Sequence, residues 1–307
     1  MIETEFGRAP FTLPFDGTRA ETFYTVFGNL KTSQQIPLVV CHGGRATHHY
    51  LKSLSQLTEE FSIPVVLYDQ LGFGLSSHFP QQEGNASFWT IEVLVEQLRQ
   101  LINYLGIQNE YDLLGHSFGT ALSIELASKP ALRAGLRKLV LWSPAASTKL
   151  LEESMKQRRE MLPADIREIL VKHETEGTAD SDEYRKAMLA SMHENFCRLE
   201  VWPDELMESF SYSGKDSDAS LTLFGTDPLA ITGSTKDWSS LQTAHFITVP
   251  TMILNGQYDW SDEALQPLLS SIPVVEWVKF ADSSHLLHFE EKERFMETLS
   301  KWLARSR

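Results

Sequence analysis

Short apolar runs recur along the chain, and most of them are separated by segments in which apolar positions repeat every three or four residues. The runs predict strands at 23–27, 38–41, 65–68, 111–114, 139–142, 252–254 and 274–280. Segment 89–105 has the helical repeat, with apolar residues on one side and charged or amide residues on the other. Continuous apolar strands that alternate with such helices indicate an α/β fold, a mostly parallel sheet covered by helices on both faces.

The alternation stops between residues 148 and 241, where charged helical stretches at 151–173 and 181–199 follow one another without an obvious strand. The strand pattern resumes at 249–254, and a final helix is predicted at 290–304. We therefore expect a core formed by residues 1–147 and 242–307, with a helical cap of residues 148–241 inserted between its two parts.

Composition narrows the classes of partner. The chain has 27 lysine and arginine residues against 41 aspartate and glutamate residues, a net charge of −14, which disfavours nucleic acid and anionic membranes as partners. The start of the sequence lacks the basic and apolar regions of a signal peptide, and no apolar run is long enough to span a membrane, so a cytoplasmic protein is expected. The remaining class of partner is a small molecule or a short peptide.

No cofactor or metal is predicted. The two cysteines, Cys41 and Cys197, do not lie in a paired metal-ligand spacing, and the adjacent His48 and His49 fit a loop better than a ligand set. Two glycines that follow the strand at 65–68 lack the third glycine and the immediate helix of a dinucleotide site. That segment is interpreted as a shaped loop.

One motif carries specific chemistry. Ser117 stands between Gly115 and Gly119, where the predicted strand 111–114 gives way to a helical pattern. This context is typical of a nucleophile elbow, a tight turn in which side chains at the flanking glycines would collide with neighbouring backbone. We therefore expect the Ser117 hydroxyl at the end of the sheet as a nucleophile; a purely structural turn is the alternative.

A serine nucleophile needs a base and an acid that orients the base. In α/β-hydrolases the acid follows a late strand and the histidine follows the last strand. Asp259 follows the strand at 252–254, and His285 follows the strand at 274–280. These two residues are the predicted partners of Ser117. Three neighbouring residues remain alternatives: Asp262, expected to cap a helix, Asp282, and His288, expected at the surface or against the cap.

The developing oxyanion needs backbone N–H donors, normally one from the residue after the nucleophile and one from a loop after an earlier strand. Phe118 follows the nucleophile, and Gly43 and Gly44 follow the strand at 38–41. We expect the Phe118 N–H to be one oxyanion donor and the N–H of Gly44 or Gly43 to be the other, with Gly44 placed in the oxyanion hole and Gly43 in the substrate pocket. An ordinary turn at the two glycines is the alternative.

Taken together, these motifs resemble the proline iminopeptidase family of α/β-hydrolases, including the tricorn-interacting aminopeptidases and their fungal relatives. The likeness spans nearly the whole chain. It includes His-Gly-Gly at 42–44, Tyr-Asp-Gln-Leu-Gly-Phe-Gly at 68–74, the elbow, and cap segments at 196–199, 202–203, 231–233 and 236–238. The resemblance implies Ser117 as nucleophile, Asp259 and His285 as its partners, Gly44 and Phe118 as oxyanion donors, and a helical cap over the site.

The chain departs from this family at two places. Peptidases of the family have Pro-Gly after His-Gly-Gly, whereas Arg45 and Ala46 stand here. Those peptidases also bind the free ammonium of the substrate with two glutamates, and the resemblance puts Pro228 and Trp260 at the two positions. Asp227, next to Pro228, supplies one acid only if its loop shifts.

An indole beside the triad favours an apolar or aromatic substrate group, and Trp202 and Phe224 are expected in the same pocket as Phe118 and Trp260. Core packing is the alternative for each aromatic residue taken singly. The leading hypothesis is a serine hydrolase that forms an acyl-enzyme on a small ester, lactone or amide, and fungal secondary metabolism is a setting suggested by the resemblance. The alternatives are release of N-terminal residues from peptides, as by a proline iminopeptidase, and a non-hydrolytic acyl transfer, cyclisation or isomerisation.

Overall fold

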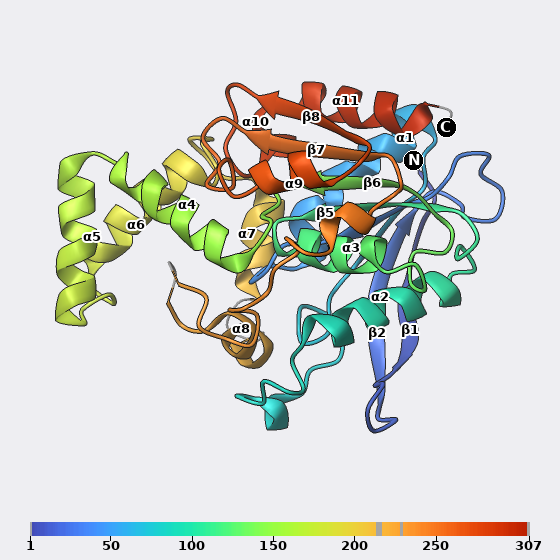
Figure 1. The fold of residues 1–307 in the computed structure, drawn as a ribbon, viewed down its shortest axis with the longest axis horizontal. Helices are drawn as coiled ribbons and strands as arrows, with labels where there is room; N and C mark the ends of the chain where they lie inside the picture. Colours follow the sequence, from blue (N-terminus) through green and yellow to red (C-terminus); the bar gives the residue numbers. More distant parts are fainter. Residues whose placement is uncertain (1, 213–216, 228–229, 306–307) are drawn as a thin grey trace.

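The computed structural model describes residues 2–212, 217–227 and 230–305, and its centre is an eight-stranded sheet. The strands lie in the order β1-β2-β4-β3-β5-β6-β7-β8; β1 and β2 are antiparallel to their neighbours, and the pairs from β4 to β8 are parallel (Figure 1). Their bounds are Thr4–Thr12, Arg19–Phe27, Leu38–Cys41, Val65–Tyr68, Tyr111–His116, Leu136–Trp142, Thr251–Gly256 and Val275–Phe280 for β1 to β8. This sheet confirms the predicted α/β class.

Helices cover both faces of the sheet because alternate side chains of each buried strand point in opposite directions. Val39 and Leu113 pack in one apolar cluster with α2 and α3, whereas Val40 and Leu114 pack in another with α1 and α11. Each fully buried side chain of this kind stabilises the fold by roughly 1.5–3 kcal/mol. The core helices are η1 His48–Leu54, α1 Ser55–Phe61, η2 Pro80–Gln82, α2 Ile91–Tyr104, α3 Phe118–Ser128, η3 Ala244–Phe246, α9 Gln266–Ser271, α10 Leu287–Glu290 and α11 Lys292–Ala304.

Between β6 and η3 the described residues form five α-helices and no strand; these helices gather at one end of the sheet, with α5 and α6 extending farthest from it (Figure 1). The predicted helix 151–173 is two helices, because Pro163 lacks the N–H that would continue the first. The bounds are α4 Thr148–Glu160, α5 Ala164–Glu176, α6 Asp182–Asn195, α7 Asp204–Ser211 and α8 Ser217–Phe224. Within the described ranges, no helix is both long and apolar enough to cross a membrane.

Candidate active site

Ser117 occupies a strained turn between β5 and α3. Its φ of 53° and ψ of −121° lie in a region that non-glycine residues seldom adopt and that costs about 1–3 kcal/mol. The flanking glycines are required sterically: a Cβ at Gly115 would lie 2.4 Å from Gly119 O, and a Cβ at Gly119 would lie 2.2 Å from Cys41 O. The Ser117 N–H donates to Trp142 O at 2.9 Å, so neighbouring β6 holds the turn in place.

Asp259 and His285 meet beyond the carboxyl ends of the adjacent parallel strands β7 and β8. Asp259 Oδ1 lies 3.0 Å from His285 Nδ1 and also accepts from the Ser261 N–H at 3.0 Å. Because the buried carboxylate accepts, the Nδ1 atom of His285 carries the proton and its Nε2 atom is the basic nitrogen. This is the tautomer that a serine nucleophile requires of its base.

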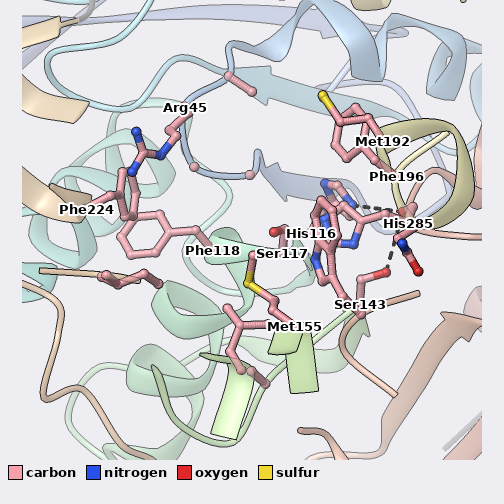
Figure 2. A pocket seen from close by; sticks show the side chains of 18 of the residues that line it. Arg45, His116, Ser117, Phe118, Ser143, Met155, Met192, Phe196, Phe224 and His285 are labelled. Atoms are coloured by element: carbon pink, nitrogen blue, oxygen red, sulfur yellow. Dashed lines mark hydrogen bonds between the residues drawn. The ribbon is translucent and has the colours of Figure 1, made fainter. Parts of the chain in front are cut away.

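Ser117 and His285 line the same cavity, and Figure 2 shows the two side chains near each other beside His116. The described residues form no hydrogen bond between Ser117 Oγ and His285. Such a bond is often long in an enzyme without substrate and shortens when the substrate is bound. The arrangement therefore permits proton transfer from the serine to the imidazole.

The alternative acids and base have other partners. Asp262 accepts from Asn255 Nδ2 at 2.9 Å and from Lys279 Nζ at 2.9 Å; it does not cap a helix, since α9 begins only at Gln266. Asp282 is exposed. His288 is fully buried and donates from Nε2 to Tyr50 O at 2.8 Å, so the expectation of a surface or cap-contacting histidine was wrong. Burial lowers the pKa of His288 to about 3.

The glycine loop after β3 lies beside Ser117, since a Cβ at Gly43 would be 3.3 Å from Ser117 Cβ. The Gly43 N–H donates to Tyr50 Oη at 2.8 Å and is therefore not available to an oxyanion. Among the described residues, neither the Gly44 N–H nor the Phe118 N–H has a hydrogen-bond acceptor. Two unpaired donors next to a serine nucleophile are what an oxyanion hole needs.

A cavity of about 400 Å³ lies between the sheet and the cap. Phe224 of α8 packs on the glycine loop, because a Cβ at Gly44 would lie 2.7 Å from its ring, and it meets the Phe118 ring edge-on at 4.8 Å. Arg45 lies over the Phe224 ring at 5.5 Å and donates to Gly225 O at 2.9 Å. Figure 2 shows this group on the far side of Ser117 from His285. Asp227, an exposed residue, also lines the cavity.

Aromatic rings form the wall on the other side. Trp260 lies 5.0 Å from the His285 ring, and Phe196 stacks on both of them at 5.8 Å and 5.7 Å. Trp202, expected in the pocket, lies outside the cavity lining because it packs behind Phe196 and donates from Nε1 to Cys197 O at 3.1 Å. Pro228 lies outside the described residues. Phe196 was not predicted individually, and its only sequence signal was the cap segment 196–199.

The described residues contain no group of three or more histidine, cysteine, aspartate or glutamate side chains that could hold a metal ion. The histidines after β3 have protein partners instead. His48 Nδ1 lies 2.8 Å from Asp69 Oδ1, and His49 Nδ1 lies 2.6 Å from Thr47 Oγ1. Both rings are buried in the 3₁₀ helix η1, where His48 joins the loop of Asp69 to η1 and His49 stacks on Tyr212 at the end of α7.

Comparison with known proteins gives consistent matches over most of the chain. The model of the alpha/beta hydrolase fold family matches residues 36–292. A proline iminopeptidase of Clostridium botulinum is 31% identical over 289 residues, which cover 92% of this chain and 94% of that protein. The crystal structure of VinJ has a TM-score of 0.89 and 36% identity, covering 97% of this chain and 98% of that one. A Mycobacterium smegmatis proline iminopeptidase structure has a TM-score of 0.87, 29% identity and 97% coverage of both chains.

Proposed function

The chain belongs to the proline iminopeptidase-like family of α/β-hydrolases, and from this premise we propose that it is a serine hydrolase acting through Ser117, His285 and Asp259. The observation that carries the proposal is one cavity that contains both the elbow serine and the histidine held by a buried aspartate. The proposed substrate is an ester, lactone or amide whose binding does not depend on a free α-amine.

The reaction follows from the proposed roles. His285 Nε2 takes the proton of the Ser117 hydroxyl while Oγ attacks the acyl carbon, and Asp259 stabilises the imidazolium without taking a proton. The N–H groups of Gly44 and Phe118 bind the oxyanion, and each such donor is typically worth about 3 kcal/mol in the transition state. The imidazolium then protonates the leaving group as the carbon–oxygen or carbon–nitrogen bond breaks. Water, deprotonated by His285, then attacks the acyl carbon. The imidazolium returns this proton to Ser117 Oγ as the bond from Oγ to the acyl carbon breaks and the acid product leaves.

The charges around the cavity support the part of the proposal that concerns the substrate. Asp227 is the one carboxylate among the described lining residues, whereas the lining includes Arg45, Arg158 and Arg159. Arg158 and Arg159 have acidic partners in Asp262 and Glu174. A substrate ammonium gains roughly 4 kcal/mol from one nearby carboxylate at an intermediate dielectric constant, before desolvation is subtracted. Because the described lining has one carboxylate and two of its three arginines are already paired, this cavity favours a neutral acyl group over one with a free ammonium.

The aromatic wall supports the same substrate class. Trp260 stands at a position where the resemblance implies an amine-binding glutamate, and its ring packs against His285 and Phe196. An indole offers apolar surface and one N–H donor, so it cannot neutralise an ammonium as a carboxylate does. Small-molecule sites are mostly apolar with a few polar groups that fix orientation, and this cavity has that character.

The second candidate function is release of an N-terminal residue from short peptides. It is favoured by the 31% identity to a protein named proline iminopeptidase, and by Asp227 at the cavity. Under this alternative Asp227 pairs with the ammonium, and the second acid of the peptidases has no counterpart at Trp260.

Matched substrates separate the two functions. Alanyl and propionyl anilides differ only by the α-amine, and prolyl-naphthylamide tests the activity for which the relatives are named. We expect kcat/KM for the propionyl compound to exceed that for the alanyl compound at least about tenfold, equivalent to roughly 1.4 kcal/mol. Efficient proline release with negligible cleavage of simple acyl compounds would refute the proposed substrate class. Ser117→Ala provides the blank, and fluorophosphonate labelling of Ser117 tests the nucleophile independently of substrate.

A further inference from the structure

A chain of hydrogen bonds connects the glycine loop to His285 through two side chains that the proposed reaction does not use. The Gly43 N–H lies 2.8 Å from Tyr50 Oη, Tyr50 Oη lies 2.6 Å from His116 Nδ1, and His116 Nε2 lies 3.2 Å from His285 O. Both side chains are only 2% exposed. His116 immediately precedes the nucleophile, so the chain passes directly beneath the elbow.

The two groups at the ends of this series of hydrogen bonds determine where each hydrogen lies. The Gly43 N–H can only donate and the His285 carbonyl can only accept, so Tyr50 Oη accepts at one end and His116 Nε2 donates at the other. His116 Nδ1 therefore accepts the Tyr50 O–H. Burial raises the pKa of Tyr50 and lowers the pKa of His116 well below its usual value, so both groups are neutral in this arrangement near neutral pH.

Both ends of the chain are anchored in the core. The His285 carbonyl also accepts from Trp142 Nε1 at 3.1 Å and from Ser143 Oγ at 3.5 Å, and Figure 2 shows Ser143 and His116 beside His285. The Tyr50 carbonyl accepts from His288 at 2.8 Å. The loop after β3 and the loop after β8 are thus tied together through the ends of β5 and β6.

We propose that Tyr50 and His116 are positioning residues that hold the oxyanion loop and His285 at a fixed separation, an inference that rests on the proposed function. Tyr50 turns the Gly43 N–H away from the substrate and leaves the Gly44 N–H to face the oxyanion. His116 holds the backbone of the base. Misplacement of a donor or base by a fraction of an ångström weakens contacts made in the transition state more than contacts made to the bound substrate.

The test uses Tyr50→Phe, which removes one hydroxyl, and His116→Leu, which removes both ring nitrogens. With a p-nitrophenyl ester we expect either change to lower kcat about 10- to 50-fold and to leave KM within about twofold, because the lost contacts act on the transition state. His116→Gln keeps one acceptor and one donor and should recover at least about half of the lost activity on a logarithmic scale. Tyr50 and His116 belong to the same series of hydrogen bonds, so breaking it at both residues should cost no more than breaking it once. The double variant Tyr50→Phe/His116→Leu should therefore be no slower than the slower single variant.

The control is Tyr111→Phe, which removes a buried hydroxyl from the opposite end of β5 and should leave kcat unchanged. Melting temperatures identify a variant that fails to fold, and His116→Gln keeps the test decisive if His116→Leu does. Wild-type kcat in Tyr50→Phe, or losses that multiply in the double variant, would overturn the inference and leave the proposed function intact. Absence of Ser117-dependent turnover in the wild type would refute the proposed function and this inference with it.

Discussion

The two sides of the cavity are built differently. On the core side, Ser117, Asp259 and His285 follow the ends of parallel strands, and the hydrogen-bonded sheet determines their separation. On the cap side, Phe196 directly follows α6, and Phe224 is the last residue of α8. The apolar cluster centred on α5 and α6 contains four buried residues: Leu162, Leu170, Tyr184 and Ala187. We infer that backbone hydrogen bonds define the three proposed catalytic positions, whereas side-chain packing shapes the cap side of the cavity.

The largest effect is expected on the core side, from replacing Asp259, the proposed acid of the triad. Asp259→Asn keeps the shape of the side chain but lets its amide donate, which favours the wrong tautomer of His285, and kcat should fall about 10³- to 10⁴-fold. Asp262→Asn is the matched control three residues away, because Asp262 binds Asn255 and Lys279. Steady-state kinetics of both variants provide the measurement. Similar losses in the two variants would mean that general charge, and not the orientation of His285, accounts for the effect.

The core could be predicted because its pattern is local. The strands β3 and β4 have four apolar residues each and are buried on both faces, so their bounds are visible in the sequence. Asp259 and His285 were found from their places after two such strands. Strand β1 was missed because it is an edge strand with largely exposed residues, among them Glu5 and Arg8, which show no continuous apolar run.

The wall of the pocket could not be predicted to the same degree. Phe196 and Trp202 are both aromatic and only six residues apart, and which ring reaches the cavity depends on how the end of α6 packs against α7. His288 was misplaced for a related reason. Its partner is the carbonyl of Tyr50, which is far away in the sequence, and the pattern of apolar residues along the chain does not predict such a contact.

Gly44 lies where the two sides touch, and Gly44→Ala is expected to have the second largest effect. The backbone at Gly44 is not left-handed, so the main obstacle to alanine is the Phe224 ring, 2.7 Å from the added Cβ. Displacing this proposed oxyanion donor should lower kcat about 10²-fold.

Phe224→Leu makes room for that methyl group and should restore part of the rate in the double variant, while alone it should change KM more than kcat. Steady-state kinetics of the three variants with one acyl ester check this. Failure of the double variant to recover any activity would show that the Phe224 ring is not what makes alanine harmful at Gly44.

A smaller effect is expected on the free energy of unfolding, which acid should lower through buried histidines on the core side. Burial lowers the pKa of His42 to about 4 and that of His288 to about 3, and both belong to the core. An unfolded histidine has a pKa near 6.5, so between about pH 6.5 and pH 4 the unfolded chain binds protons that the folded chain does not. The stabilisation is complete above this window and is lost as the pH falls through it. Each such group reduces the free energy of unfolding by roughly 1 kcal/mol between pH 6 and pH 5. Burial also lowers the pKa of His49 and that of His116, so these two core histidines act in the same direction.

Urea unfolding at pH 6 and pH 5 measures this loss. His288→Gln should make the loss smaller by roughly 1 kcal/mol, because one of the buried histidines no longer titrates. His245→Gln is the control, since His245 is exposed in η3 and should leave the difference unchanged. An undiminished loss in His288→Gln would assign the acid sensitivity to groups other than the buried core histidines.

Trp260 lies on the boundary, since it follows the core residue Asp259 while its ring packs on Phe196 of the cap. Trp260→Glu puts a carboxylate at the place where the resemblance implies one. It should raise the ratio of kcat/KM for the alanyl anilide to that for the propionyl anilide about tenfold, equivalent to roughly 1.4 kcal/mol. This is less than the roughly 4 kcal/mol of direct attraction, because the carboxylate and the ammonium must both lose water. Loss of the stacked indole lowers both rates, so the ratio is the quantity to compare. Trp260→Gln is the control, because glutamine has nearly the same shape as glutamate but no charge. If it changes the ratio as much as Trp260→Glu does, the size of the side chain and not its charge determines which substrate is preferred.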